Sequence, residues 1–227
     1  MKVHIGIPCY GGKIDHRLIG VIQNAGETKL QVQTGNFSIL TRNFNGLYAK
    51  ALNSRKDGVT HFLMLHDDVI PMENGWLDKM MEISAEKKAD ILSVVLPIKD
   101  ARGLTSTALD NLNHPYKVTR LTLDEVYKLP ETFTFQDLLI NTGLMLVDIR
   151  TPEAEGLCFQ FEDWIESSAD GFRPVGMSED WVFSREAHKV GMSVFATRAI
   201  SAIHMGHNGF ANTQPWGRWK RDEEAGT

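Results

Sequence analysis

The stretch "FLMLHDDVIP", residues 62–71, runs from four apolar residues into a histidine, two aspartates, an apolar pair and a proline. An apolar run of this kind predicts a strand, within residues 60–69, that helices cover on both faces. Carboxylates at the end of such a strand are costly unless they are paired or bind a cation. Asp67 and Asp68 therefore mark a metal site, a helix cap or a solvated turn, and the surrounding sequence is needed to choose.

Two further apolar stretches predict neighbouring strands. Residues 2–10, "KVHIGIPCY", predict a strand that stops at Pro8, and residues 89–98, "ADILSVVLPI", predict another. Apolar residues at helical spacing predict amphipathic helices within residues 36–52 and 74–89. The resulting β-α-β-α-β order predicts an α/β fold with a largely parallel central sheet flanked by helices, and ligands beyond the carboxyl ends of the strands.

The second half of the chain is less regular. Polar and turn-forming residues between 99 and 117 predict a long functional loop or lid. A Thr-x-x-Glu capping box predicts a short helix within residues 122–129, and another helix is expected over residues 178–191. Residues 138–149 predict a strand interrupted by an Asn-Thr-Gly turn, and residues 192–209 predict a pair of short strands that ends at two histidines.

Length and composition are compatible with one large domain. The 227 residues are 42% hydrophobic, so we expect a single domain over residues 1–215 and a charged tail that frays over residues 216–227. The formal net charge of -5 disfavours bulk attraction to nucleic acid, although "GRWKR" at residues 217–221 is a local basic patch beside Trp216. Two isolated cysteines and the lack of a membrane-length apolar run favour a cytoplasmic protein without a membrane anchor.

Polar residues are concentrated near the predicted strand ends. The clusters are residues 8–12, residues 66–68, residues 141–143, Glu179 with Asp180, and His204 with His207. Because the carboxyl ends of parallel strands meet at one edge of a sheet, we expect these clusters to line one crevice.

A divalent cation is the ligand that suits part of this set. Asp68 supplies the carboxylate oxygen that Mn²⁺ and Mg²⁺ prefer, and a late histidine, His204 or His207, supplies a nitrogen that Mn²⁺ accepts. Alternation along a strand would place His66 and Asp68 on one face and Asp67 on the other, unless the strand has already ended. The alternatives are a solvated turn for the aspartates and a packed or exposed ring for each histidine.

The other clusters also have structural interpretations. Glu179 and Asp180 stand in the first turn of a predicted helix, where the helix dipole favours acidic residues. Asn141, Thr142 and Gly143 are equally typical of a β-bulge. Each signal is weak alone, and the case for a site rests on their common location and their order along the chain.

Several common nucleotide and hydrolase motifs are missing from the sequence. No G-x-G-x-x-G follows the first predicted strand, and "GIPCYGGK" at residues 6–13 has Gly12 where the P-loop lysine belongs. No G-x-S-x-G elbow is present. These absences disfavour hydride transfer, ATP hydrolysis and serine-hydrolase chemistry.

Taken in order, the residues resemble the GT-A glycosyltransferases, particularly the family 2-like enzymes. Across residues 1–210, the stretches "IPCY", "RN", "LHDDVIP", "NTGLMLV", "SEDWVF" and "IHMGH" are similar to that family's ordered motifs. One departure is that the family's acidic motif is Asp-x-Asp, whereas His66 stands at its first position here. The resemblance implies the GT-A fold of a nucleotide-diphospho-sugar transferase.

The resemblance also implies a role for each motif. It assigns to the nucleotide Pro8, Cys9, Tyr10, Arg42 and Asn43, together with His66, Asp67 or both. It assigns Asp68 and His204 to the cation, Asn141, Thr142 and Gly143 to the acceptor side, and Asp180 and Glu179 to catalysis. In these terms Asp180 is the expected general base, and Glu179 orients the acceptor.

The implied activity is transfer of a hexosyl or pentosyl group from a nucleotide-sugar, a UDP-sugar being favoured, to an acceptor hydroxyl, with Mn²⁺ or Mg²⁺ as cofactor. The acceptor is a glycan, a lipid, a protein or a modified nucleic-acid base. Inversion is expected if Asp180 is the base. The alternatives are a retaining GT-A enzyme and a domain that binds a nucleotide-sugar without transferring it, in which Glu179 and Asp180 only cap their helix.

Overall fold

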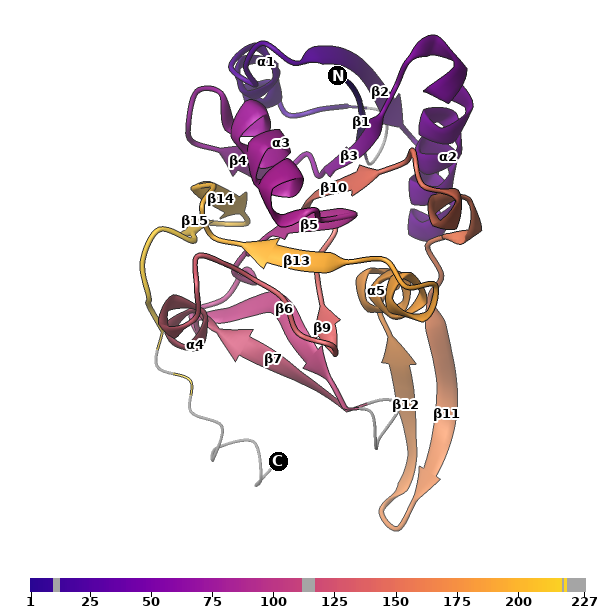
Figure 1. The fold of residues 1–227 in the computed structure, drawn as a ribbon. Helices are drawn as coiled ribbons and strands as arrows, with labels where there is room; N and C mark the ends of the chain where they lie inside the picture. Colours follow the sequence, from indigo (N-terminus) through magenta and orange to yellow (C-terminus); the bar gives the residue numbers. More distant parts are fainter. Residues whose placement is uncertain (10–12, 112–116, 218, 220–227) are drawn as a thin grey trace.

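A seven-stranded sheet forms the centre of the computed structural model, which describes residues 1–9, 13–111, 117–217 and 219 (Figure 1). Its strands are β1 (Lys2–Pro8), β2 (Lys29–Gly35), β3 (His61–Leu65), β5 (Ile91–Val94), β8 (Thr132–Phe133), β10 (Leu144–Asp148) and β13 (Val194–Thr197). Their spatial order is β2-β1-β3-β10-β5-β13-β8.

Most strands of this sheet run in one direction. β1 is parallel to β2 and β3, and β5 is parallel to β13. β10 lies antiparallel between β3 and β5, and β8 is antiparallel to β13. The predicted α/β class with a mostly parallel central sheet is therefore confirmed. One consequence is that β10 begins at the same edge of the sheet at which β1 and β3 end.

Helices cover both faces of the central sheet (Figure 1). They are α1 (Arg17–Gln23), α2 (Leu40–Asn53), α3 (Trp76–Lys87), α4 (Leu123–Lys128) and α5 (Glu179–Lys189), with short 3-10 helices η2 (Ser54–Asp57) and η3 (Pro152–Gly156). α1 and α3 pack on one face through residues such as Leu18 and Trp76, and α2 and α5 pack on the other through Phe44 and Phe183. None of the described helices has the length and apolar character needed to cross a membrane.

The amphipathic pattern of α2 explains its position. Phe44, Leu47, Tyr48 and Ala51 recur every three or four residues, and each is at most 2% exposed. Burying each large apolar side chain contributes about 1.5–3 kcal/mol. The helix is thereby held against the sheet, with its first turn at the edge where β1 ends.

Three smaller sheets complete the fold. The first contains β4 (Val69–Pro71), β14 (Ala202–Met205) and β15 (Gly209–Ala211), in the order β15-β14-β4. The second contains β6 (Leu104–Asp110), β7 (Val118–Thr122) and β9 (Leu138–Leu139), in the order β7-β6-β9. The third is a hairpin of β11 (Glu162–Ser168) and β12 (Gly171–Met177), which projects from the body of the molecule in Figure 1.

The structure corrects several sequence predictions. The predicted loop over residues 99–117 contains β6, because apolar residues such as Leu104 and Ala108 pair with β7 and its two threonines are buried. The predicted strand over residues 60–69 is shorter than expected, because β3 ends at Leu65, and Val69 begins β4 in a different sheet. The predicted strand over residues 138–149 is likewise divided between β9 and β10, so its polar turn marks a change of sheet and not a bulge within one ladder.

The first two residues of the predicted tail are packed against the fold. Trp216 donates a hydrogen bond from Nε1 to the Ala211 carbonyl at 2.8 Å, and its ring lies 5.7 Å from that of Phe210. Gly217 packs against the backbone of Arg102. The chain is therefore packed at the start of the predicted tail, and most of "GRWKR" lies outside the described residues.

Candidate functional site

A pocket of about 190 Å³ opens between the ends of β1 and β3 and the start of α2. It is lined by Pro8, Cys9, Phe37, Ser38, Leu40, Asn43, His66, Asp67 and Asp68. The pocket brings together two clusters that the sequence placed at strand ends, and Asn43 from the first turn of α2. It therefore lies at the carboxyl edge of the sheet, where the α/β pattern predicts ligand binding.

A tight turn accounts for the arrangement of His66, Asp67 and Asp68. The β3 ladder ends at Leu65, and the His66 N–H donates to the Gly143 carbonyl at 2.9 Å. The N–H of Val69 then donates to the His66 carbonyl at 3.1 Å, which closes the turn. Strand alternation has ended before Asp67, so neighbouring side chains are no longer forced onto opposite faces. All three polar residues line the same pocket as a result.

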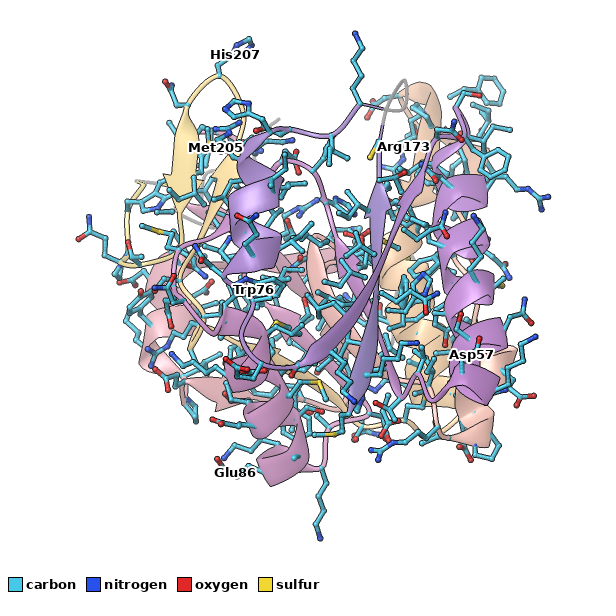
Figure 2. All side chains as sticks on the ribbon, turned by 90° about the horizontal axis from the view of Figure 1, so that it is seen from above. Asp57, Trp76, Glu86, Arg173, Met205 and His207 are labelled. Atoms are coloured by element: carbon cyan, nitrogen blue, oxygen red, sulfur yellow. The ribbon has the colours of Figure 1, made fainter. Side chains whose placement is uncertain are left out.

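Strand pairing brings the predicted cation ligands together. β4 and β14 pair with Val69 opposite His204, and the N–H of Met205 donates to the Asp68 carbonyl at 2.7 Å. Nε2 of His204 consequently lies 3.6 Å from Oδ2 of Asp68. His207 is exposed in the turn after β14 and points away from the body of the molecule in Figure 2. Of the two candidate histidines, His204 is the one at Asp68.

The hydrogen bonds of these two residues suit a cation between them. Nδ1 of His204 is 2.7 Å from the carbonyl of Pro97, which can only accept, so Nδ1 carries the proton. Nε2 then faces Asp68, where it donates to the carboxylate while it carries a proton and can bind a cation once the proton has left, an orientation common among metal-binding histidines. Oδ1 of Asp68 is buried and has no hydrogen-bond partner in the described part of the chain. A nitrogen and a carboxylate oxygen fit Mn²⁺ in particular.

In the described part of the chain, the site offers two such ligands. Among residues 1–9, 13–111, 117–217 and 219, no group of three or more His, Cys, Asp or Glu side chains is placed to hold a metal ion. A cation at Asp68 and His204 would complete its coordination with water and with oxygen atoms of a bound substrate. Mg²⁺ and related cations commonly bind in this way, through few protein ligands and substrate phosphates.

The charge of Asp68 is stabilised by its neighbours. Burial disfavours the charged form, but hydrogen bonds with His204 and Lys99 outweigh burial and hold the pKa of Asp68 below its usual range. The ammonium Nζ of Lys99 lies 2.5 Å from Oδ2 of Asp68. For neighbouring Asp67, burial and the charge of Asp68 raise the pKa. Asp68 is thus the carboxylate that stays ionised.

A hydrogen-bonded chain connects this region to the start of α5. Oγ1 of Thr142 donates to Oδ1 of Asp180 at 3.0 Å and lies 3.3 Å from Nε2 of His66. Burial lowers the pKa of His66 to about 4, so its ring is neutral. Because the single Thr142 proton is directed to the carboxylate, His66 donates its Nε2 proton to Thr142. Asp180 is therefore two hydrogen bonds from a residue that lines the pocket.

Asp180 is poised to exchange a proton near neutral pH. Burial and the charge of Glu179 raise the pKa of Asp180 to about 7, against hydrogen bonds from Thr142 that lower it. The preceding residue, Ser178, makes no side-chain capping bond. The Asp180 carboxylate is bound by the loop before β10 and not by the N–H groups of its own helix. A capping role alone does not explain this geometry.

The other two residues of the Asn-Thr-Gly turn shape the backbone. Nδ2 of Asn141 donates to the Val94 carbonyl at 2.8 Å, and Oδ1 accepts from the Gly143 N–H at 3.1 Å. A Cβ on Gly143 would lie 2.7 Å from Cδ1 of Leu96, so a side chain there would require Leu96 to move. Thr142 is the member of the turn that reaches the hydrogen-bonded chain, and the acceptor-side role of all three stays a prediction.

The predicted nucleotide residues differ in their relation to the pocket. Pro8, Cys9 and Asn43 line it, and Oδ1 of Asn43 is buried without a partner in the described part of the chain. Arg42 is exposed, is not among the pocket residues, and lies with its guanidinium 5.8 Å from the ring centre of Phe37. Tyr10 falls outside the described residues.

Sequence reasoning missed four residues of this region. Phe37, Ser38 and Leu40 line the pocket, and Lys99 contacts Asp68. The three pocket residues stand directly before or at the start of α2, and a helix that starts beside a strand end is a usable signal for a binding wall. Nothing in the spacing of the polar segment after β5 singles out Lys99.

Comparisons with known proteins give a fold relationship. No protein-family model matches the sequence, and no curated protein matches it. Among solved structures, A197 from STIV is similar with a TM-score of 0.57 and 14% sequence identity, over 97% of this chain and 99% of that one. HddC from Yersinia pseudotuberculosis gives a TM-score of 0.38 at 14% identity, over 88% of this chain and 72% of that one, which is too low to support a common fold.

Proposed function

We propose that this chain is a metal-dependent glycosyltransferase with the GT-A fold, which moves a sugar from a nucleotide-sugar donor to an acceptor hydroxyl. The observation that carries the proposal is the pair formed by Asp68 and His204. A histidine nitrogen and a carboxylate oxygen, both common metal ligands, lie 3.6 Å apart at a pocket on the carboxyl edge of a mostly parallel sheet. The family 2-like order of the motifs supports the same function.

The pocket is the proposed site for the donor nucleotide. Pro8 and Cys9 form its wall at the end of β1, and the Asn43 amide oxygen has no partner of its own in the described residues. A buried polar atom of this kind favours a ligand that can donate a hydrogen bond to it. In this proposal the base lies against these residues, and Asp67 binds the ribose hydroxyls. A UDP-sugar is the favoured donor.

Asp68 and His204 are the proposed ligands of the cation. When bound there, Mn²⁺ or Mg²⁺ would neutralise the negative charge that develops on the departing diphosphate. Asp68 stays ionised because its neighbours hold its pKa down, which suits a residue that binds a cation throughout the reaction. Pro97 fixes the imidazole of His204 through Nδ1 and keeps Nε2 directed at Asp68.

Asp180 is the proposed general base. The acceptor oxygen attacks the anomeric carbon, the bond from that carbon to the diphosphate oxygen breaks, and the acceptor proton passes to the Asp180 carboxylate. A base with a pKa near the working pH performs this transfer well, and the pKa of Asp180 is raised to about 7. A single displacement of this kind inverts the anomeric configuration. Thr142 keeps the carboxylate oriented, and Glu179 beside it is the proposed contact for the acceptor.

A donor and acceptor screen tests the proposal. Nucleotide-sugars with different bases are added with and without Mn²⁺, and binding is followed as a rise in melting temperature. Release of the nucleoside diphosphate is then measured with glycan, lipid, protein and modified-nucleic-acid acceptors. The proposal predicts one donor class that binds only with the cation and is consumed in the presence of an acceptor. Binding without turnover on any acceptor would favour a nucleotide-sugar-binding domain, and a product of unchanged configuration would favour a retaining enzyme.

A further inference from the structure

Lys99 makes a contact that the proposed function has not used. It follows β5, and its ammonium lies 2.5 Å from Oδ2 of Asp68. The same oxygen faces Nε2 of His204 at 3.6 Å. The Lys99 side chain lies beside Gly206, in the turn after β14. A lysine and a histidine therefore share one carboxylate oxygen.

A divalent cation between Asp68 and His204 would bind that oxygen, because Oδ2 faces Nε2 of His204 whereas Oδ1 is buried. Oδ2 is the Asp68 atom that is paired with His204, so a cation between the two residues meets the Lys99 ammonium at the same place. Like charges repel strongly over a few ångströms when they are partly shielded from water. A cation bound there would therefore displace Lys99 from Asp68.

This displacement is easily made. The Lys99 side chain is 41% exposed, and ion pairs at such exposure are weak because water screens them. Lysine carries a compact charge on a flexible four-carbon stem, so the ammonium can turn without moving the backbone. After leaving Asp68 it remains tethered close to any anion that the cation binds.

We propose that Lys99 is a second positive group of the donor site, which binds the diphosphate after a divalent cation has replaced it at Asp68. The inference rests on the proposed function, and it adds a contact between a protein side chain and the leaving diphosphate. Lysine binds phosphate well as a point charge. Lys99 therefore weakens the binding of the cation alone and strengthens the binding of the diphosphate beside the cation. Because the two equilibria are linked, Lys99 makes cation and diphosphate bind cooperatively.

Calorimetric titration of Lys99→Met distinguishes this role from a structural one. Mn²⁺ alone should bind about threefold more tightly to the variant than to the wild type, because its competitor is gone. UDP, GDP, ADP, CDP and dTDP are each titrated in saturating Mn²⁺. The tightest of them should bind Lys99→Met about tenfold more weakly than the wild type. Effects of opposite sign on two ligands are not expected from a residue that only supports the fold.

Two matched variants serve as controls. Lys99→Arg keeps the positive charge and should retain both the weak binding of Mn²⁺ alone and most of the diphosphate affinity. Lys87→Met removes a lysine of similar exposure, 38%, from the end of α3. Figure 2 shows its neighbour Glu86 at the opposite end of the molecule from His207, so this variant should change neither affinity. Melting curves confirm that each variant is folded.

The outcomes separate this inference from the function on which it rests. If the wild type binds Mn²⁺ and a nucleoside diphosphate cooperatively, but Lys99→Met changes neither affinity or changes both in the same direction, Lys99 has no such role and the proposed function stands. If the wild type binds neither Mn²⁺ nor any of the nucleotides, both proposals are overturned.

Discussion

Asp68 and Asp180 are the same residue type in two regions of one candidate site, and their surroundings give them opposite acidities. At Asp68, burial disfavours the charge, but His204 and Lys99 outweigh it and hold the pKa below its usual range. At Asp180, burial is reinforced by the charge of Glu179, and the pKa is raised to about 7. The difference arises because cationic or proton-donating side chains surround the Asp68 carboxylate, whereas the carboxylate of Glu179 lies beside Asp180.

The two pKa values suit two different roles: Asp68 keeps its charge, and Asp180 can take up and release a proton. An aspartate that remains ionised can hold a cation, and an aspartate that titrates near pH 7 can take a proton during a reaction. His66 and Thr142 join the two regions through contacts of 3.3 and 3.0 Å. Variants that act on one region and spare the other test whether the two carboxylates differ in function as they do in acidity.

Asp180→Asn should have the largest effect. The amide keeps the size of the side chain but loses the basic oxygen, so sugar transfer should fall by about 10²-fold or more while donor binding persists. Wild-type transfer should also fall as the pH is lowered through about 7, because Asp180 becomes protonated. Initial rates of nucleoside diphosphate release across pH 5–9, roughly the range in which such a base titrates, check both expectations.

The helix-cap interpretation of Asp180 makes a different prediction for the same variant. It predicts a stability loss on the order of 0.3–1 kcal/mol and nearly normal transfer by the folded protein. Melting temperature and transfer rate measured on one sample distinguish the two interpretations. Near-normal transfer would exclude Asp180 as an essential base.

His204→Ala should have the next largest effect, and His207→Ala is its matched control. Loss of Nε2 removes one of two proposed protein ligands, so the Mn²⁺ concentration needed for half-maximal donor binding should rise at least about tenfold. His207 is exposed, three residues along the same turn region, and its removal should leave the Mn²⁺ requirement unchanged. Equal behaviour of the two variants in a Mn²⁺ titration would rule out His204 as a ligand.

Thr142→Val tests the connection between the two regions. Hydrogen bonds from Thr142 lower the pKa of Asp180, so loss of the hydroxyl should raise that pKa further. The pH midpoint of transfer should move upward by about half a unit to one unit, and the rate at pH 7 should fall several-fold. Thr107→Val is a suitable control, because Thr107 is fully buried and its Oγ1 has no partner in the described residues. An unchanged midpoint in Thr142→Val would show that Thr142 does not act on Asp180.

His4→Leu should have the smallest effect, and it concerns stability only. His4 is fully buried in β1, and neither ring nitrogen has a partner among the described residues. Burial, with the charges of Lys50 and Lys2, lowers the pKa of His4. The unfolded chain therefore binds more protons below about pH 6.5, and the fold loses stability as the pH falls through that value.

The leucine removes both the unpartnered nitrogens and this proton uptake. His4→Leu should be more stable by about 1 kcal/mol at pH 7, and by more at pH 5. Thermal melts at both pH values measure the gain. A variant less stable than the wild type at both pH values would mean that the His4 ring makes an interaction that leucine cannot replace.

The parts of the fold that could be predicted from the sequence are those with long, regular apolar patterns. The strand over residues 2–10 and the helix over residues 36–52 are of this kind, and the structure has β1 and α2 there. α1 and β2 were not predicted, because α1 is only seven residues long and β2 is an edge strand with mostly exposed or half-buried residues. The hairpin of β11 and β12 is largely exposed, so hydrophobic patterning does not mark it.

Part of the candidate site could also be predicted from the sequence. Strand ends and helix starts are visible in the sequence, and they led to Asp68, His204 and Asp180. Long-range contacts are not visible: Lys99 reaches Asp68 across 31 residues of chain, and Thr142 reaches Asp180 across 38. Arg42 lies where its motif predicts, in the first turn of α2, but its side chain packs on Phe37 instead of lining the pocket.

The most direct test of different roles for the two aspartates is a paired calorimetric titration of Asp68→Asn and Asp180→Asn with the nucleotide-sugar that the wild type binds, with and without Mn²⁺. The account predicts that Asp68→Asn loses Mn²⁺-dependent donor binding, and that Asp180→Asn binds the donor with Mn²⁺ within about threefold of the wild type. Undiminished Mn²⁺-dependent binding by Asp68→Asn, or an equal loss of binding in both variants, would contradict it.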